Sequence, residues 1–391
     1  MKQAAFYLTF FIGAIVFYSC KKSLNVEVTK KNVNVLVVEG FINTVDSTKI
    51  TLSRTVVIGN KITANPELNA QITLENATGT VAALQHMGKG VYATQSLILD
   101  NTKQYRVRIK TNNGKTYLSD LTDAKVTQPI DEIGYDATNA GISIYANTHD
   151  ATNNSRYYFY NYEETWEFRT KLISGYRTTG SEIVPRTPAD YIDHCFGFQS
   201  SNNIIVNSTA ALMQDVAYKA PIATVASNSE KLGIKYSILV TQTALTKDAY
   251  AFWDNLRKNT ESLGSIFDAQ PSEISGNIHN VADADEPVIG YISAGTKQSK
   301  RIFIKKADLP SSYKFEYPYA CPLDSAFISS PPKGKFTVAG VLVPLTASFL
   351  PAGAIWLEGS IPPAIIGYEY SVRPCLDCTV RGRVQQPSFW K

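Results

Sequence analysis

Short segments of alternating polar and apolar residues follow one another between residues 33 and 128. A period of two residues places alternate side chains on opposite faces of a half-buried β-strand. Asn113-Gly114 separates two of these segments, and Asn-Gly tolerates the positive φ that a tight hairpin turn requires. Several short strands with regular turns predict a small β-sandwich over 33–128. The segments are 35–42, 49–57, 71–76, 81–85, 105–110 and 116–119.

The residues from Pro129 onward predict a second, larger β-rich domain over 129–391. Proline cannot donate a backbone hydrogen bond and biases the residue before it to an extended conformation, which suits a boundary. Within this domain, the predicted strand 157–169 carries aromatic side chains on both faces. We therefore expect a central strand between two packed layers. The alternative is an aromatic platform for a sugar or peptide ligand, with contact residues Tyr158, Tyr160, Tyr162 and Trp166.

The same strand carries three carboxylates close together, Glu163, Glu164 and Glu167. Such a set is suited to acid–base chemistry or to binding a cation. A solvated strand edge is the more ordinary interpretation, because charged side chains are mostly exposed.

One amphipathic helix is predicted over 247–263. Thr246 is a suitable N-cap, because its hydroxyl can accept a hydrogen bond from a free backbone N–H group. Asp248 lies in the first turn, where the helix dipole favours a negative charge, and Gly264 follows as a stop. We expect its apolar stripe to pack on a sheet, and a helix offered to a partner is the alternative. The stripe comprises Ala249, Phe252, Trp253, Leu256, Thr260 and Leu263.

Two further features complete the second domain. Segments 288–294 and 300–305 are predicted to pair as a hairpin around Gly295-Thr296. Residues 306–367 are rich in proline and apolar side chains, and proline blocks ordinary ladder pairing. This stretch is either a contact surface or a set of loops packed on their own core.

Residues 1–20 have the layout of an export signal. Lys2 precedes an uncharged apolar run that ends in Tyr18-Ser19-Cys20, and the run is too short to span a membrane comfortably. Cleavage before Cys20 would leave a cysteine able to carry a diacylglycerol lipid with palmitate-type acyl chains. We therefore predict a lipoprotein signal peptide at 1–19 and a lysine-bearing tether at 20–32. An ordinary secretory signal with a chance cysteine is the alternative.

The composition is that of a globular protein. The chain has 391 residues, of which 18% are charged, and its formal net charge is +4. This length suits two or three domains. The positive charge is mild and scattered, so we expect no nucleic-acid partner.

Four cysteines besides Cys20 form an even set in an exported chain: Cys195, Cys321, Cys375 and Cys378. Disulfides are the default outside the cytosol, and four cysteines allow three connectivities. A zinc or redox role for Cys375-x-x-Cys378, with His194, Cys195 or His279 as further ligands, is the alternative. A bond within Cys375-x-x-Cys378 would close a very short loop and constrain little. Bonds from the C-terminal pair back to Cys195 and Cys321 are therefore favoured.

The sequence has no motif that commits it to catalysis. Gly-x-Ser-x-Gly, His-Glu-x-x-His and Gly-x-x-x-x-Gly-Lys are all absent. The acidic run at 283–286 lacks the ligand periodicity of a dedicated calcium loop. We therefore expect no catalytic residues, no metal and no cofactor apart from the N-terminal diacylglycerol lipid.

Two resemblances add to these observations. The first domain resembles the transthyretin-like sandwich of carboxypeptidase regulatory domains, through Ile72-Thr73-Leu74, Gly90-Val91-Tyr92, Tyr105-Arg106-Val107 and Gly114-Lys115-Thr116-Tyr117. Almost the whole chain after the signal resembles the Bacteroidota lipoprotein family catalogued as domain of unknown function 4249. The matching segments are 37–42, 162–168, 236–242, 264–268, 276–278, 289–291, 375–378 and 387–390. This resemblance implies an outer-membrane location, often beside TonB-dependent transporters, and no established activity.

Three functional hypotheses follow. The first is a non-enzymatic, lipid-anchored outer-membrane protein that serves a TonB-dependent barrel as an accessory binding subunit for an unidentified nutrient. The second is a structural or envelope-interaction lipoprotein, and the third is an enzyme of unrecognised class. Whether the anchored protein faces the periplasm or the cell surface is left open by the sequence.

Overall fold

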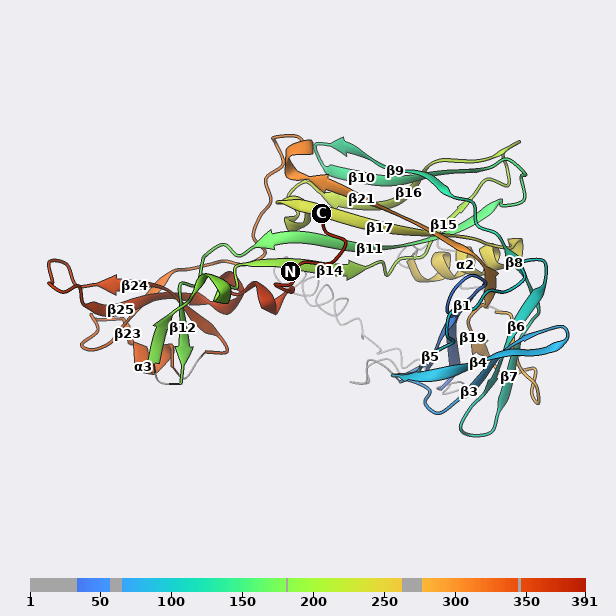
Figure 1. Ribbon diagram of the computed structural model, residues 1–391, viewed down its shortest axis with the longest axis horizontal. Coiled ribbons are helices and arrows are strands. Elements are labelled where there is room, and N and C mark those ends of the chain that lie inside the picture. Colours follow the sequence, from blue (N-terminus) through green and yellow to red (C-terminus); the bar gives the residue numbers. More distant parts are fainter. Residues whose placement is uncertain (1–33, 57–64, 181, 262–275, 344–345) are drawn as a thin grey trace, which may run out of the picture.

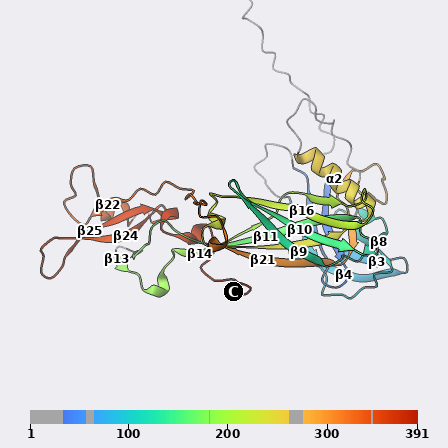
Figure 2. The ribbon, with the colours of Figure 1, turned by 90° about the horizontal axis from the view of Figure 1, so that it is seen from above.

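Pairing between strands that are distant in sequence dominates the structure. The structure is a computed structural model, and it describes residues 34–56, 65–180, 182–261, 276–343 and 346–391. The fold is mainly β, as the sequence predicts. Three units follow one another in an elongated arrangement: a sandwich, a middle unit and a distal unit (Figures 1 and 2). The predicted signal peptide, Cys20 and the tether lie outside the described residues.

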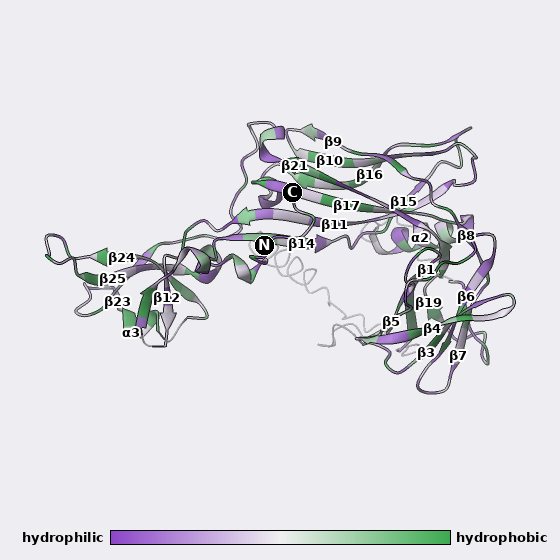
Figure 3. Cartoon of the chain, viewed as in Figure 1, coloured by the Kyte–Doolittle hydropathy of each residue, from purple (hydrophilic) through white to green (hydrophobic). Residues whose placement is uncertain are grey.

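The first sandwich is built from eleven strands whose ladder closes on itself. β8, at one end of the strand order, pairs with both β20 and β6, which closes the ring of strands from β6 to β8 and leaves β7 and β18 beside it. Alternate side chains point into a single core, so polar and apolar residues alternate along these strands (Figure 3). The strands are β1 (Leu36–Asn43), β2 (Lys49–Arg54), β3 (Gln71–Asn76), β4 (Gly79–Gly88), β5 (Val91–Ala93), β6 (Gln104–Lys110), β7 (Thr116–Ser119), β8 (Thr122–Lys125), β18 (Ile278–Asn280), β19 (Val288–Ile289) and β20 (Ser293–Gly295).

Three of these strands come from far along the chain. β18 pairs with β7, while β19 and β20 pair in parallel with β1. The predicted domain boundary between residues 128 and 129 is therefore incomplete, because residues 276–295 return to the first sandwich. The predicted hairpin of 288–294 with 300–305 is wrong for the same reason, because β20 and the strand that follows it belong to different sheets. Parallel pairing between distant segments leaves no local signal in the sequence.

A buried carboxylate on this sandwich makes its stability sensitive to acid. The side chain of Glu75 lies 2.9 Å from Arg106 Nε and 2.5 Å from Arg108 Nε. The hydrogen bond from Arg108, aided by Arg106, outweighs burial and lowers the pKa of Glu75. A lowered pKa in the folded state adds stability above the unfolded pKa, about 4.3, and this stability is lost as the pH falls through the folded value.

We therefore expect Glu75→Gln to destabilise the protein most at neutral pH. The difference in unfolding midpoint between wild type and variant should shrink as the pH falls below about 4, where the wild-type carboxylate also becomes neutral. Denaturant titrations across this pH range measure it. A difference that stays constant down to acid pH would contradict the role given to the ion pairs.

The middle unit consists of two sheets packed face to face. One sheet has the order β16-β10-β9, and the other has the order β14-β11-β17-β21 with β15 beside β11. Their facing sides share one core that is rich in Ile and Tyr. The strands are β9 (Ile130–Thr138), β10 (Gly141–Asp150), β11 (Tyr157–Arg169), β14 (His194–Ser200), β15 (Ile205–Ser208), β16 (Asp215–Ala226), β17 (Lys235–Ala244) and β21 (Lys297–Lys305), with short 3-10 turns at η2 (Glu230–Leu232) and η3 (Lys306–Asp308).

Helix α2 (Lys247–Glu261) covers the other face of β11. Thr246 caps it as predicted, because its hydroxyl accepts a hydrogen bond of 3.2 Å from the Ala249 N–H. Phe252 is buried and Trp253 packs 5.0 Å from Phe159 of β11, measured between ring centroids. The stripe is shorter than predicted, since Thr260 is exposed and Leu263 lies outside the described residues. Nowhere in the described chain is a helix both long enough and apolar enough to cross a membrane.

The distal unit is a separate small fold, although the proline-rich sequence of 306–367 predicts loops. A four-stranded sheet and a two-stranded hairpin enclose a core of their own. The hairpin packs on the sheet through Tyr176 and Tyr368, whose ring centroids are 5.2 Å apart. Its elements are β12 (Tyr176–Thr179), β13 (Glu182–Pro185), β22 (Asp324–Phe327), β23 (Phe336–Thr337), α3 (Val338–Val341), β24 (Phe349–Trp356) and β25 (Ile365–Val372), flanked by 3-10 turns at η1 (Pro188–Asp190), η4 (Arg373–Cys375) and η5 (Cys378–Val380).

Candidate functional site

Two of the four proposed ligand contacts on β11, Tyr158 and Tyr160, are closed to a ligand. Tyr158 and Tyr160 are 0% exposed and belong to the core between the two middle sheets. Tyr162 and Trp166 are half-buried and pack against the same core. The strand lies between a second sheet on one side and α2 on the other, so its aromatic side chains stabilise both layers. The central-strand interpretation is therefore correct, and the ligand-contact alternative fails for Tyr158 and Tyr160.

The three carboxylates of β11 also serve separate purposes. Glu164 is buried, and it accepts hydrogen bonds from Lys231 Nζ at 2.6 Å and from the Tyr236 hydroxyl at 2.7 Å. Glu167 lies 2.8 Å from His194 Nε2, and Glu163 is exposed. Alternation turns Glu164 to the side opposite Glu163 and Glu167, and these two stand four residues, roughly 13 Å, apart along the strand. The three groups therefore do not converge on one substrate.

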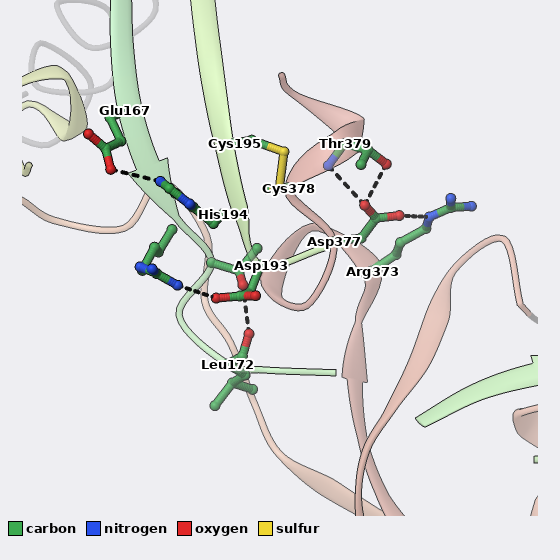
Figure 4. Close-up of a disulfide and its surroundings, with 11 residues drawn as sticks. Glu167, Leu172, Asp193, His194, Cys195, Arg373, Asp377, Cys378 and Thr379 are labelled. Carbon is green, nitrogen blue, oxygen red and sulfur yellow. Dashed lines mark hydrogen bonds and ion pairs between the residues drawn. A yellow bond between two sulfur atoms is a disulfide. The ribbon is translucent and has the colours of Figure 1, made fainter. Parts of the chain in front are cut away.

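The four cysteines are joined as two disulfides, Cys195–Cys378 and Cys321–Cys375. Figure 4 shows the first of them. Both bonds tie the C-terminal pair back to earlier segments, in agreement with the connectivity that the short Cys375-x-x-Cys378 loop favours. A thiolate engaged in a disulfide is not a zinc ligand, and within the described ranges no three His, Cys, Asp or Glu residues are grouped to hold a metal.

A cleft of about 560 Å³ lies where the first sandwich, β11 and α2 meet. Figure 1 shows α2 beside β1, between the sandwich and the middle sheets. The volume falls within the range of about 300–1,000 Å³ that is typical of small-molecule sites. Its walls come from β1 and β2, from β11 and β17, from α2, and from the segment between β19 and β20.

Two covalent connections hold the walls of this cleft together. The chain passes from the sandwich to the middle unit near Thr127 and does so again at Thr296. The two crossings are hydrogen-bonded to each other, because the Thr127 N–H donates to the Thr296 hydroxyl at 2.8 Å. Gly290 lets the segment between β19 and β20 approach β1 closely, because a Cβ there would lie 2.1 Å from the Val38 carbonyl oxygen. The cleft is therefore largely preformed.

The cleft has an aromatic wall. The Phe252 ring of α2 packs against the Tyr291 ring at a tilt, with ring centroids 5.4 Å apart. The Trp253 ring packs against Phe159 in the same way. Leu256, one helical turn further along, also lines the space. Aromatic faces of this kind accept flat apolar bodies and bury a large area for each side chain.

Two lysines also line this cleft. Lys297, the first residue of β21, places its ammonium 4.7 Å from the ring centroid of Phe41 on β1. Lys49 of β2 lies directly across the ladder from Phe41. Neither lysine takes part in the ion pairs found among the described residues, and desolvation, followed by repulsion from Lys49, lowers the pKa of Lys297.

Sequence reasoning did not find this site, because its residues come from segments far apart in the chain. A partial signal existed: the outward face of β1 carries the apolar residues Val37 and Phe41, on either side of Glu39, where a solvent-exposed strand would carry polar residues. The alternation on that strand is apolar on both sides, which indicates that the second side is also covered.

Comparisons with known proteins bear on the family and leave the function open. No curated protein matches the chain. Among solved structures, the Escherichia coli adhesin FdeC aligns at 14% identity and a TM-score of 0.15, covering 50% of this chain and 64% of that one. The Yersinia pseudotuberculosis adhesin InvE aligns at 12% identity and a TM-score of 0.13, covering 54% and 57%. The chain thus spans less than two thirds of these adhesins, and TM-scores this low support no argument about fold or function.

One family does match, and it matches most of the chain. The family described as "Domain of unknown function (DUF4249)" aligns with residues 21–301. The aligned range takes in the first sandwich, nearly all of the middle unit and every wall of the cleft. The chain is therefore a member of the DUF4249 family.

Proposed function

We propose that this protein is a non-enzymatic outer-membrane lipoprotein that holds a small ligand in the cleft and serves as an accessory binding subunit of a TonB-dependent transporter. The observation that carries the proposal is the cleft itself: a preformed space of ligand size with an aromatic wall and two unpaired lysines. Sites of this composition recognise a ligand by apolar contact and a few placed charges.

The membrane part of the proposal rests on the sequence. Residues 1–20 have the layout of a lipoprotein signal, and Cys20 would carry the lipid. A protein tethered by one residue near its first sandwich keeps its cleft close to the membrane, which is where a transporter would accept the ligand.

The distal unit supports the presence of a protein partner. Its β24–β25 hairpin exposes apolar side chains, including Ile361 at 96% exposure and Trp356 and Leu357 at about half exposure. Grouped apolar side chains on a surface often mark protein contacts. This surface is separate from the cleft, so partner docking and ligand binding can take place together.

The test is a crosslinked pull-down from native outer membranes through a tag joined to the exposed C-terminal Lys391. We expect a large TonB-dependent barrel in near-equal amount to the lipoprotein. A matched strain carrying Cys20→Ala should lose both the anchor and the barrel. Recovery of the lipoprotein without a barrel would overturn the transporter role, and a deletion strain with a leaky envelope would then favour the structural alternative.

A further inference from the structure

We propose that the ligand of the cleft is an amphipathic organic monoanion: an apolar or aromatic body that carries one carboxylate, sulfate or sulfonate group. This inference deepens the proposed function, since it assumes that the cleft is a binding site. It names the chemistry of the ligand and the residues that select it.

The charge argument starts from Lys49 and Lys297. The two residues come from different units of the protein: the Lys297 ammonium lies over the Phe41 ring, and Lys49 is the direct ladder neighbour of Phe41. They are close enough for the charge of Lys49 to lower the pKa of Lys297. Like charges that face one space without a carboxylate partner repel each other, and an anion placed between them removes that repulsion.

A third charged residue limits the charge of the ligand. Glu39 lies two positions before Phe41 on the same face of β1, and no ion pair of the described residues joins it to Lys49 or Lys297. Among the residues that the structure describes, Glu39, Lys49 and Lys297 are the charged residues that line the cleft, and together they carry a net charge of one positive unit. A single anionic group balances this charge, whereas a polyanion would meet the carboxylate of Glu39 as well.

The apolar part of the ligand is set by the aromatic wall. Phe159, Trp253 and Leu256 line the cleft, and none of them lies on the strands that carry the two lysines. A ligand with its anionic group at the lysines therefore places its body against this wall. Each half of such a ligand then has a partner in the cleft, the apolar body on the aromatic wall and the anionic group at the lysines.

The experiment uses two fluorescent probes with the same aromatic body on the purified mature protein. Anilinonaphthalene sulfonate carries one anionic group, and phenylnaphthylamine is neutral. We expect the sulfonate to bind at one site per chain, with energy transfer from Trp253, and to bind about tenfold or more tightly than the neutral probe. Sulfonate binding should weaken with added salt, whereas neutral-probe binding should not.

Variants assign the effect to the cleft. The double variant Lys49→Met with Lys297→Met should weaken sulfonate binding about tenfold or more and leave the neutral probe unchanged, because only the charge interaction is removed. Trp253→Ala should weaken both probes. Lys110→Met removes an equally exposed lysine of β6 that does not line the cleft, and it should change neither. Lys297→Arg keeps the charge and should retain sulfonate binding.

Three results would overturn the inference: no sulfonate binding, equal binding of both probes, or sulfonate binding that survives the double lysine variant. Loss of folding in the double variant would leave the salt dependence and Lys297→Arg as the deciding measurements. Failure of the probes together with a recovered barrel would remove the ligand class alone. Sulfonate binding without a barrel would remove the transporter role alone.

Discussion

Replacing both Cys195 and Cys378 by alanine should lower the free energy of unfolding by about 3–5 kcal/mol. The bond joins residues 183 positions apart, so the unfolded chain that contains it has lost much of its freedom. Both residues are 0% exposed and lie beside Phe168 in a small apolar cluster. Removing the sulfur atoms therefore also leaves part of that cluster unfilled.

The bond matters because it fixes the end of the chain to the middle unit. Cys378 donates its backbone N–H to the Ile192 carbonyl at 2.7 Å, and Phe196 exchanges two backbone hydrogen bonds with Arg383. The last residues then turn back, so that Trp390 packs on Phe196 with ring centroids 5.2 Å apart. Without the disulfide, this C-terminal segment is held to β14 by non-covalent contacts alone.

Denaturant unfolding followed by tryptophan fluorescence measures the effect, because Trp166 and Trp390 both lie near this bond. The matched control is Cys321→Ala with Cys375→Ala, whose bond spans 54 positions and should cost less, about 2–4 kcal/mol. Thiol labelling of the denatured wild type should find no reactive group at any of the four cysteines. Two or more labelled sites in the wild type would disprove the disulfides.

Replacing Glu164 by alanine should cost about 2–4 kcal/mol of stability. Glu164 is 4% exposed and accepts from Tyr236, which is 0% exposed, and from Lys231. Burial, followed by the charge of Glu164, raises the pKa of Tyr236, so its hydroxyl stays protonated and needs an acceptor. The variant leaves that hydroxyl and the Lys231 ammonium without a partner.

Glu163→Ala is the matched control for this prediction. Glu163 is the preceding residue on the same strand, but it is exposed and has no ion pair among the described contacts. Its loss should change stability by less than about 0.5 kcal/mol. Thermal and denaturant unfolding of both variants measure the difference. An equal loss of stability in the two variants would contradict the assignment of Glu164 as buried and Glu163 as solvated.

Local pattern was sufficient for most of the individual elements. Alternation identified β2, β3, β6 and β11, and the Thr246 cap and the apolar stripe located α2. Strand alternation and helix capping depend on residues close together in the chain, so a short stretch of sequence is enough to predict them. The aromatic residues of β11 were assigned correctly as packing, because a strand that is apolar on both faces must be covered on both faces.

Contacts between distant segments were decided by the tertiary structure. The return of β18, β19 and β20 to the first sandwich depends on pairing across more than 150 residues, and such pairing is set by the whole core. The distal unit was missed because its strands are short and interrupted by proline, so that local pattern and final pairing disagree.

By itself the sequence determined the β class of the fold, the helix and the family to which the chain belongs. The tertiary structure alone brought Lys49, Lys297 and the aromatic wall of α2 to one cleft. The physical reason is that periodicity reports which face of an element is covered, whereas a binding site depends on which other element covers it.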